Sequence, residues 1–91
     1  MNPADHQHIT LEPREILNDG SKRVGYLVYS AGALAAVVIA VTEEDTGATP
    51  GWFVEAGFGP CSSLRVVDPP IFPTLDDVAP WVAAQIAQAA N

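Results

Sequence analysis

The feature that most constrains this chain is an uncharged run from Val24 to Val41, VGYLVYSAGALAAVVIAV. Its 18 residues are long enough for a short membrane-spanning helix, and the preceding Lys22 and Arg23 fit the positive-inside rule. The run is also rich in residues that favour strands, and Ser30-Ala31-Gly32 interrupts its middle with turn residues. We therefore predict a β-hairpin in a soluble protein, with the spanning helix as the alternative.

Turn and strand signals on both sides of this run extend the hairpin into a sheet. The segment Asn18-Asp19-Gly20-Ser21 supplies residues that accept a positive φ, as a tight hairpin turn requires. Pro13 lies within the first predicted strand, which is therefore expected at a sheet edge. Strands are predicted over residues 9–17, 22–29, 33–42, 51–56 and 61–67.

The C-terminal segment has the pattern of a single helix. Asp76 and Asp77 place acids in its first turn, where the helix dipole favours them. Pro80 must also lie within about the first turn, so the effective cap is expected at Asp76 or Asp77 rather than at Thr74. Apolar residues recur at helical spacing along one side. These are Leu75, Val78, Val82, Ile86 and Ala89.

Strands followed by one helix predict an α+β fold, an antiparallel meander of about five strands with the helix packed on one sheet face. Residues 1–8 are expected to form a flexible tail and residues 9–91 a single small domain. Strand 33–42 is apolar at alternate positions on both sides, whereas a helix covers only one face. The face carrying Val37, Ile39 and Val41 should then expose a large apolar patch, unless the sheet curls strongly. This pattern predicts a homodimer or another covering protein.

The charge balance argues against direct binding of nucleic acid. The 91 residues include 11 acids and four bases, which gives a net charge of −7. Such a chain repels phosphates but attracts a basic protein surface. The acidic cluster Glu43, Glu44 and Asp45 is therefore a candidate partner-binding segment. One concrete form is a small inhibitor, of the kind that mobile elements encode, occupying the basic nucleic-acid-binding surface of its target.

Cysteine and histidine usage argues against a metal site, a cofactor and nucleophilic catalysis. Cys61 is the only cysteine, which excludes an intrachain disulfide and favours a reducing, cytoplasmic location. Together with His6 and His8 it supplies too few ligands for zinc. Both histidines fall in the predicted tail, so no base is expected near the thiol.

The glycine-rich segment EAGFGPCSSLR, residues 55–65, is the part of the chain that most resembles a site. Without a following helix or a lysine it does not fit a phosphate-binding loop, and a turn between strands is expected. Glu55 and Arg65 are placed to form a structural ion pair across this turn, and Phe58 is a candidate anchor for a partner.

The sequence thus favours a non-enzymatic protein-interaction module with no cofactor, metal or membrane association. The alternative is a small enzyme or ligand-binding domain that uses Glu55, Arg65 and Cys61. No motif is specific enough to identify a family.

Overall fold

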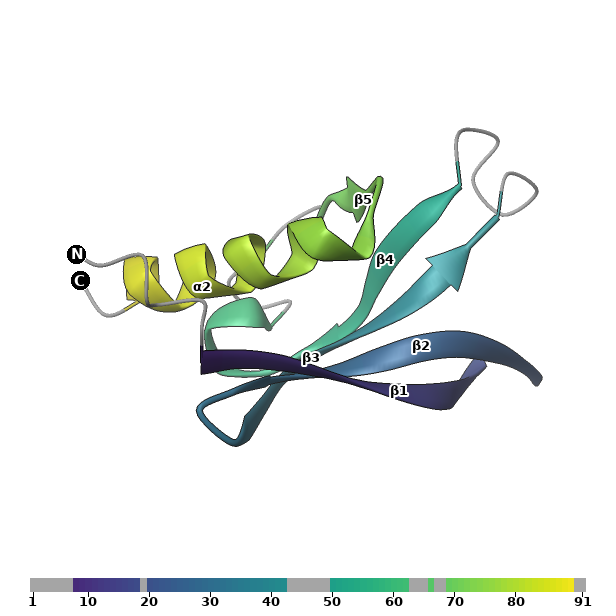
Figure 1. The fold of residues 1–91 in the computed structure, drawn as a ribbon, viewed down its shortest axis with the longest axis horizontal. Helices are drawn as coiled ribbons and strands as arrows, with labels where there is room; N and C mark the ends of the chain where they lie inside the picture. Colours follow the sequence, from purple (N-terminus) through teal and green to yellow (C-terminus); the bar gives the residue numbers. More distant parts are fainter. Residues whose placement is uncertain (1–7, 19, 43–49, 63–65, 67–68, 90–91) are drawn as a thin grey trace.

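Five strands form one antiparallel sheet in chain order in the computed structural model, which describes residues 8–18, 20–42, 50–62, 66 and 69–89 (Figure 1). The strands are β1 (Ile9–Asn18), β2 (Ser21–Ser30), β3 (Ala33–Val41), β4 (Gly51–Gly57) and β5 (Ile71–Phe72). The helix α2 (Val78–Ala89) lies across one face of this sheet (Figure 1). The predicted α+β meander with one C-terminal helix is confirmed.

The uncharged run forms a hairpin, as predicted. Strands β2 and β3 pair in antiparallel register, with Leu27 opposite Val37. Ala31 and Gly32 both have positive φ, of 50° and 86°, which is the combination that a mirror-image hairpin turn requires. In the part of the chain that the structure describes, no helix is long and apolar enough to cross a membrane.

The fifth strand does not lie where the sequence predicted it. Cys61 ends a short 3-10 helix (Gly59–Cys61), and Ser62 and Val66 lie outside any strand. The remainder of the predicted strand lies outside the described residues. Strand β5 instead consists of Ile71 and Phe72, which pair with Phe53 and Trp52 of β4. The neighbouring prolines do not prevent this pairing, because an outer edge strand needs no outward N–H groups.

The helix begins in two steps. A 3-10 turn (Leu75–Asp77) comes first, and the Asp77 carboxylate accepts hydrogen bonds from the Thr74 backbone N–H at 3.3 Å and from its hydroxyl at 3.0 Å. The α-helix follows directly after Asp77, so that Pro80 lies in its first turn, where a missing N–H costs little.

The core lies between α2 and the sheet. Val78 and Val82 of the helix are fully buried against Val28 and Val38 of the central strands. Leu75 and Ile86 pack at the margin of this cluster, whereas Ala89 is exposed. Two edge-to-face aromatic pairs flank it, Phe72 with Trp81 at 5.6 Å and Tyr26 with Trp52 at 5.4 Å between ring centroids. The sheet therefore contributes to this core mainly from one of its two faces.

Strands β2 and β3 separate beyond the pair Gly25–Ile39, where their ladder ends. Just past that point the Arg23 guanidinium donates a hydrogen bond of 3.3 Å to the backbone carbonyl of Ala40. Beyond it β1 and β2 continue as a two-stranded arm, which diverges from β3 and β4 in Figure 1.

Candidate functional site: the outer sheet face

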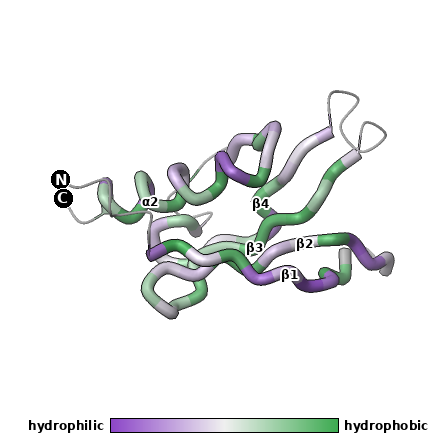
Figure 2. The backbone as a smooth tube through the Cα atoms, viewed as in Figure 1, coloured by the Kyte–Doolittle hydropathy of each residue, from purple (hydrophilic) through white to green (hydrophobic). Residues whose placement is uncertain are grey.

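The face of the sheet opposite α2, called the outer face below, is the first candidate. Because side chains alternate along a strand, the register assigns its members row by row across the sheet. Leu27 lies beside Val37, Tyr29 beside Leu34, and Ile39 beside Phe53, which in turn pairs with Ile71. No described helix or strand packs over this face (Figure 1). Figure 2 shows hydrophobic residues along much of β3, whereas hydrophilic residues gather on β1 and at the β1–β2 turn.

The exposure of the three predicted contact residues differs from the expectation. Ile39 and Val41 are only 3% and 9% exposed within the single chain, so they do not form the open patch that strand alternation alone suggested. Val37 is half-buried. The apolar residues that remain accessible on the outer face are Leu34 and Ile71, 38% and 44% exposed, together with the half-buried side chains of Leu27, Tyr29 and Phe53.

Two neighbours on β1 and β2 account for the burial of Ile39 and Val41. Gly25 lies opposite Ile39 in the sheet. The Ile16 side chain fills the space where a side chain at position 25 would lie, because a Cβ on Gly25 would be 2.4 Å from the Cγ1 atom of Ile16. Arg23 reaches the Ala40 carbonyl, which places its aliphatic stem beside β3. The sheet thus covers part of its own outer face.

Charges on the outer face cancel. Glu12 and Arg14 of β1 lie on this side and form an ion pair, and Arg23 lies on it opposite Ile16. Glu55 is the extra residue of a β-bulge, because Ala56 pairs with Val37 and Val54 with Val38. Its side chain is exposed. Within the described part of the chain, two acids and two bases give this face a net charge of zero, although the whole chain carries −7.

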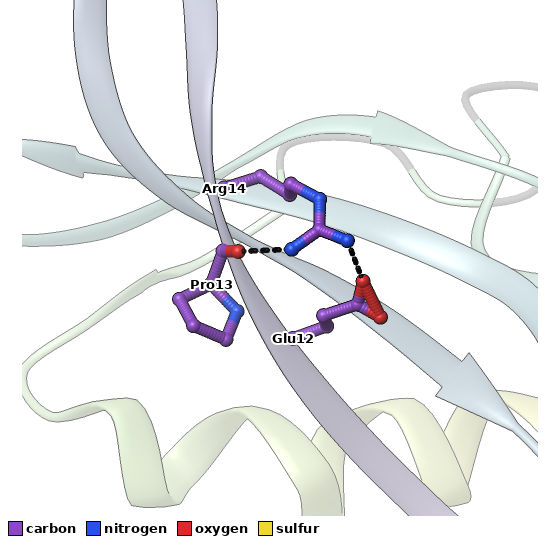
Figure 3. A network of polar contacts seen from close by, with 3 residues as sticks. All are labelled: Glu12, Pro13 and Arg14. Carbon is purple, nitrogen blue, oxygen red and sulfur yellow. Dashed lines mark hydrogen bonds and ion pairs between the residues drawn. The ribbon is translucent and has the colours of Figure 1, made fainter.

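The free edge of β1 is blocked at its centre (Figure 3). Pro13 lies opposite Tyr26 in a non-hydrogen-bonded pair, so the backbone groups of position 13 point away from β2 toward the free edge. Proline has no N–H group to donate at this edge. Its carbonyl accepts a hydrogen bond of 2.8 Å from Arg14 Nη1, and Glu12 holds the same guanidinium in place. An approaching strand therefore finds neither a donor nor a free acceptor at this position.

The glycine-rich segment forms a second candidate, a pocket at the edge of β4. It has a volume of about 310 Å³, and Glu55, Gly57, Cys61 and Val66 are among its lining residues. Gly57 is required here by close approach, because a Cβ at that position would lie 1.9 Å from the Cys61 carbonyl oxygen. The predicted turn between Glu55 and Cys61 is present, but Arg65 lies outside the described residues, so the proposed Glu55–Arg65 ion pair stays a prediction.

Cys61 has the environment of a structural thiol. It is 3% exposed and belongs to the core cluster under α2. Burial raises the pKa of the Cys61 thiol, which keeps it protonated at neutral pH, whereas activated cysteines have a lowered pKa. The described residues contain no group of three or more side chains that could hold a metal ion.

Three further features predicted from the sequence are Phe58, the acidic cluster and the histidines near the N-terminus. Phe58 is 45% exposed directly after β4, where its backbone N–H bonds to the Ala35 carbonyl at 2.9 Å. Glu43, Glu44 and Asp45 lie outside the described residues, as does His6. The His8 carbonyl accepts a hydrogen bond from the Ala31 N–H at 3.0 Å, which ties the last residue of the predicted tail to the β2–β3 turn.

Two features were missed from the sequence. Leu17 and Val24 are 73% and 60% exposed on the β1–β2 arm, on the same sheet face as α2. The blocking of the β1 edge at Pro13 by Arg14 and Glu12 was also missed. The sequence does contain a signal for it, because the residues before and after a proline in a strand share one sheet face, so that an acid and a base in these positions can pair.

Comparison of the chain with protein-family models, with curated proteins and with solved structures gives no match.

Proposed function

We propose that this protein is a non-enzymatic interaction module that binds another protein through its outer sheet face. The observation that carries the proposal is the combination of accessible apolar side chains and cancelled charge on a face that no described element covers. Leu34 and Ile71 are exposed there, and Val37 is half-buried near the centre. Contiguous apolar surface with a polar margin is characteristic of protein-binding sites.

The blocked edge supports docking on the face over addition of a strand. Pro13 and Arg14 obstruct the β1 edge at its centre. At the other edge, β5 has only two residues and lies between Pro70 and Pro73. Short, proline-bounded edges are the devices by which sheets avoid pairing with extra strands. A partner therefore binds mainly through side chains.

The acidic form of this function, inhibition of a basic nucleic-acid-binding surface, depends on Glu43, Glu44 and Asp45. The net charge of −7 is what supports it. A cytoplasmic location belongs to the same proposal and rests on the single thiol of Cys61.

Ligand binding at the β4 edge is the second candidate, and the pocket beside Glu55 and Cys61 favours it. Its volume of about 310 Å³ lies at the lower end for small-molecule sites. The raised pKa of Cys61 supports a binding role over nucleophilic catalysis.

Affinity capture from a lysate of the source organism with three matched baits tests the first proposal. Val37→Lys places a charge on the outer face, and Val24→Lys makes the same change on the opposite face at an exposed position. We expect wild type and Val24→Lys to capture the same protein and Val37→Lys to lose it by at least about tenfold, as for loss of a central contact.

Circular dichroism and thermal unfolding of each bait show whether the fold is intact. Capture that survives both Val37→Lys and the exposed-site variant Leu34→Lys would contradict binding through the outer face. Loss with Val24→Lys alone would move the site to the other side of the sheet.

A further inference from the structure

We propose that the partner of the outer face is a second copy of this chain, in a symmetric face-to-face dimer. The inference rests on the proposed function and names its partner. In a two-fold dimer the same patch meets itself, so the patch must be self-complementary in charge and shape.

The charge distribution favours self-association on this face. Two copies that each carry −7 repel one another, and the repulsion is smallest where local charge cancels. Among the described residues, the outer face has two acids, Glu12 and Glu55, against two bases, Arg14 and Arg23. On the helix side, three acids (Glu15, Asp76 and Asp77) stand against one base, Lys22. Of the described faces, the outer one therefore opposes a second copy least.

The available area fits a reversible dimer. Five strands about 4.8 Å apart span roughly 19 Å, and the rise of four residues from Gly25, where the β2–β3 ladder ends, to Tyr29 adds a length of roughly 13 Å. The projected area is thus at most about 250 Å² per copy, or about 500 Å² for the pair, well below the roughly 1,200 Å² of stable complexes. We infer a dimer with a dissociation constant in the micromolar range or weaker.

The geometry of the sheet suits this contact. Two sheets pack face to face about 10 Å apart when their inner residues interdigitate. Leu34 and Ile71 project at separate corners of the outer face, and Val37 lies on the middle strand between them. Because Val37 lies near the centre, a two-fold axis brings it close to its own equivalent, and one substitution perturbs the contact twice.

The β1–β2 arm is a weaker candidate for self-association. Leu17 and Val24 are more exposed than Leu34 and Ile71 of the outer face, but they lie on a ribbon of only two strands. Four residues of such a ribbon offer roughly 100 Å² in projection, far too little for an interface of its own. The arm therefore serves as the control surface in the test.

Sedimentation equilibrium from low micromolar to near-millimolar concentration tests the dimer. We expect the wild-type mass to rise from 9.6 kDa toward twice that value. Val24→Lys should follow the same curve. Val37→Lys should weaken association at least about tenfold, because it places two lysine charges against each other and against apolar side chains near the two-fold axis. Leu34→Lys and Ile71→Lys change exposed positions, so they provide the same test if Val37→Lys fails to fold.

A wild-type chain that stays monomeric over the whole range overturns the dimer, as does equal weakening by Val24→Lys and Val37→Lys. The capture experiment separates this failure from failure of the proposed function. A monomeric wild type whose captured partner is lost with Val37→Lys means that the outer face binds a different protein. A monomer whose capture is insensitive to Val37→Lys contradicts both.

Discussion

At the scale of single residues, Cys61 and Gly57 determine how the chain turns back at the end of β4. The Cys61 backbone carbonyl occupies the space where any other residue at position 57 would place its Cβ, and the Cys61 side chain enters the core below α2. This arrangement gives the thiol a packing role and restricts position 57 to glycine.

Burial of Cys61 predicts an alkaline loss of stability. The folded-state pKa of the thiol is raised above its ordinary value of 9.0, so the folded chain holds this proton more tightly than the unfolded chain. The stabilisation is complete below pH 9.0 and is lost as pH rises toward the folded-state pKa. We expect the unfolding free energy of wild type to fall more steeply with pH in this window than that of Cys61→Ala, measured by urea unfolding.

The two proteins differ only at position 61, so the difference between the two curves isolates the thiol. Parallel curves would show that Cys61 ionises freely in the folded chain. Cys61→Ala should keep its outer-face binding, because the side chain lies under α2; loss of binding with an intact fold would overturn the non-enzymatic proposal.

At the scale of elements, the edge strand β1 is protected by local chemistry. Pro13 has no N–H, its carbonyl is occupied by Arg14, and Glu12 orients the guanidinium. The arrangement uses three consecutive residues, so it needs no support from the rest of the fold.

The variant Pro13→Val should expose this edge. Valine restores an outward N–H at the centre of β1 without removing a ladder bond, so we expect no loss of thermal stability but faster aggregation. Light scattering during incubation at raised protein concentration measures the rate of aggregation. Thr10→Val adds the same residue to β1 and leaves Pro13 in place, so it serves as the control. Equal aggregation of both variants would mean that Pro13 does not protect the edge.

At the scale of the whole molecule, association depends on the balance between the net negative charge of the chain and the apolar surface that it exposes. The chain is strongly acidic, yet the described part of the outer face exposes apolar side chains and carries no net charge, and these two properties predict opposite responses to salt. Screening weakens attraction between an acidic surface and a basic partner, whereas it leaves burial of apolar area largely unchanged.

We expect association through the outer face to change by less than about threefold between low and high salt, and self-association to strengthen slightly as repulsion between the acidic copies is screened. Fluorescence anisotropy of labelled protein at two salt concentrations measures this. A steep fall in affinity with salt would favour the acidic-inhibitor form of the function.

Much of the architecture was readable from the sequence, because it depends on local rules. The hairpin 24–41 followed from strand-forming residues around a turn, and the edge position of β1 followed from Pro13. The start of α2 after Asp77 followed from Pro80 and the preceding acids, but the sequence argument was wrong to pass over Thr74, which is the N-cap of the 3-10 turn and forms a capping box with Asp77. The exposure of Phe58 beside a glycine turn was also expected from sequence.

Other features depend on contacts between residues far apart in the chain, which only the tertiary structure decided. The alternation of side chains places Ile39 and Val41 on the sheet face opposite the helix, where they would be expected to be exposed. They are buried because Ile16 of β1 and Arg23 of β2 cover them. Strand β5 is Ile71–Phe72, whereas Cys61 and Ser62 lie outside any strand, because the chain turns in the 3-10 helix Gly59–Cys61, where the Cys61 carbonyl lies close to Gly57. The alternation of side chains and the strand propensity of residues describe one strand at a time. The burial of a side chain on a twisted sheet depends instead on which strands lie beside its own strand and on where the register between them shifts.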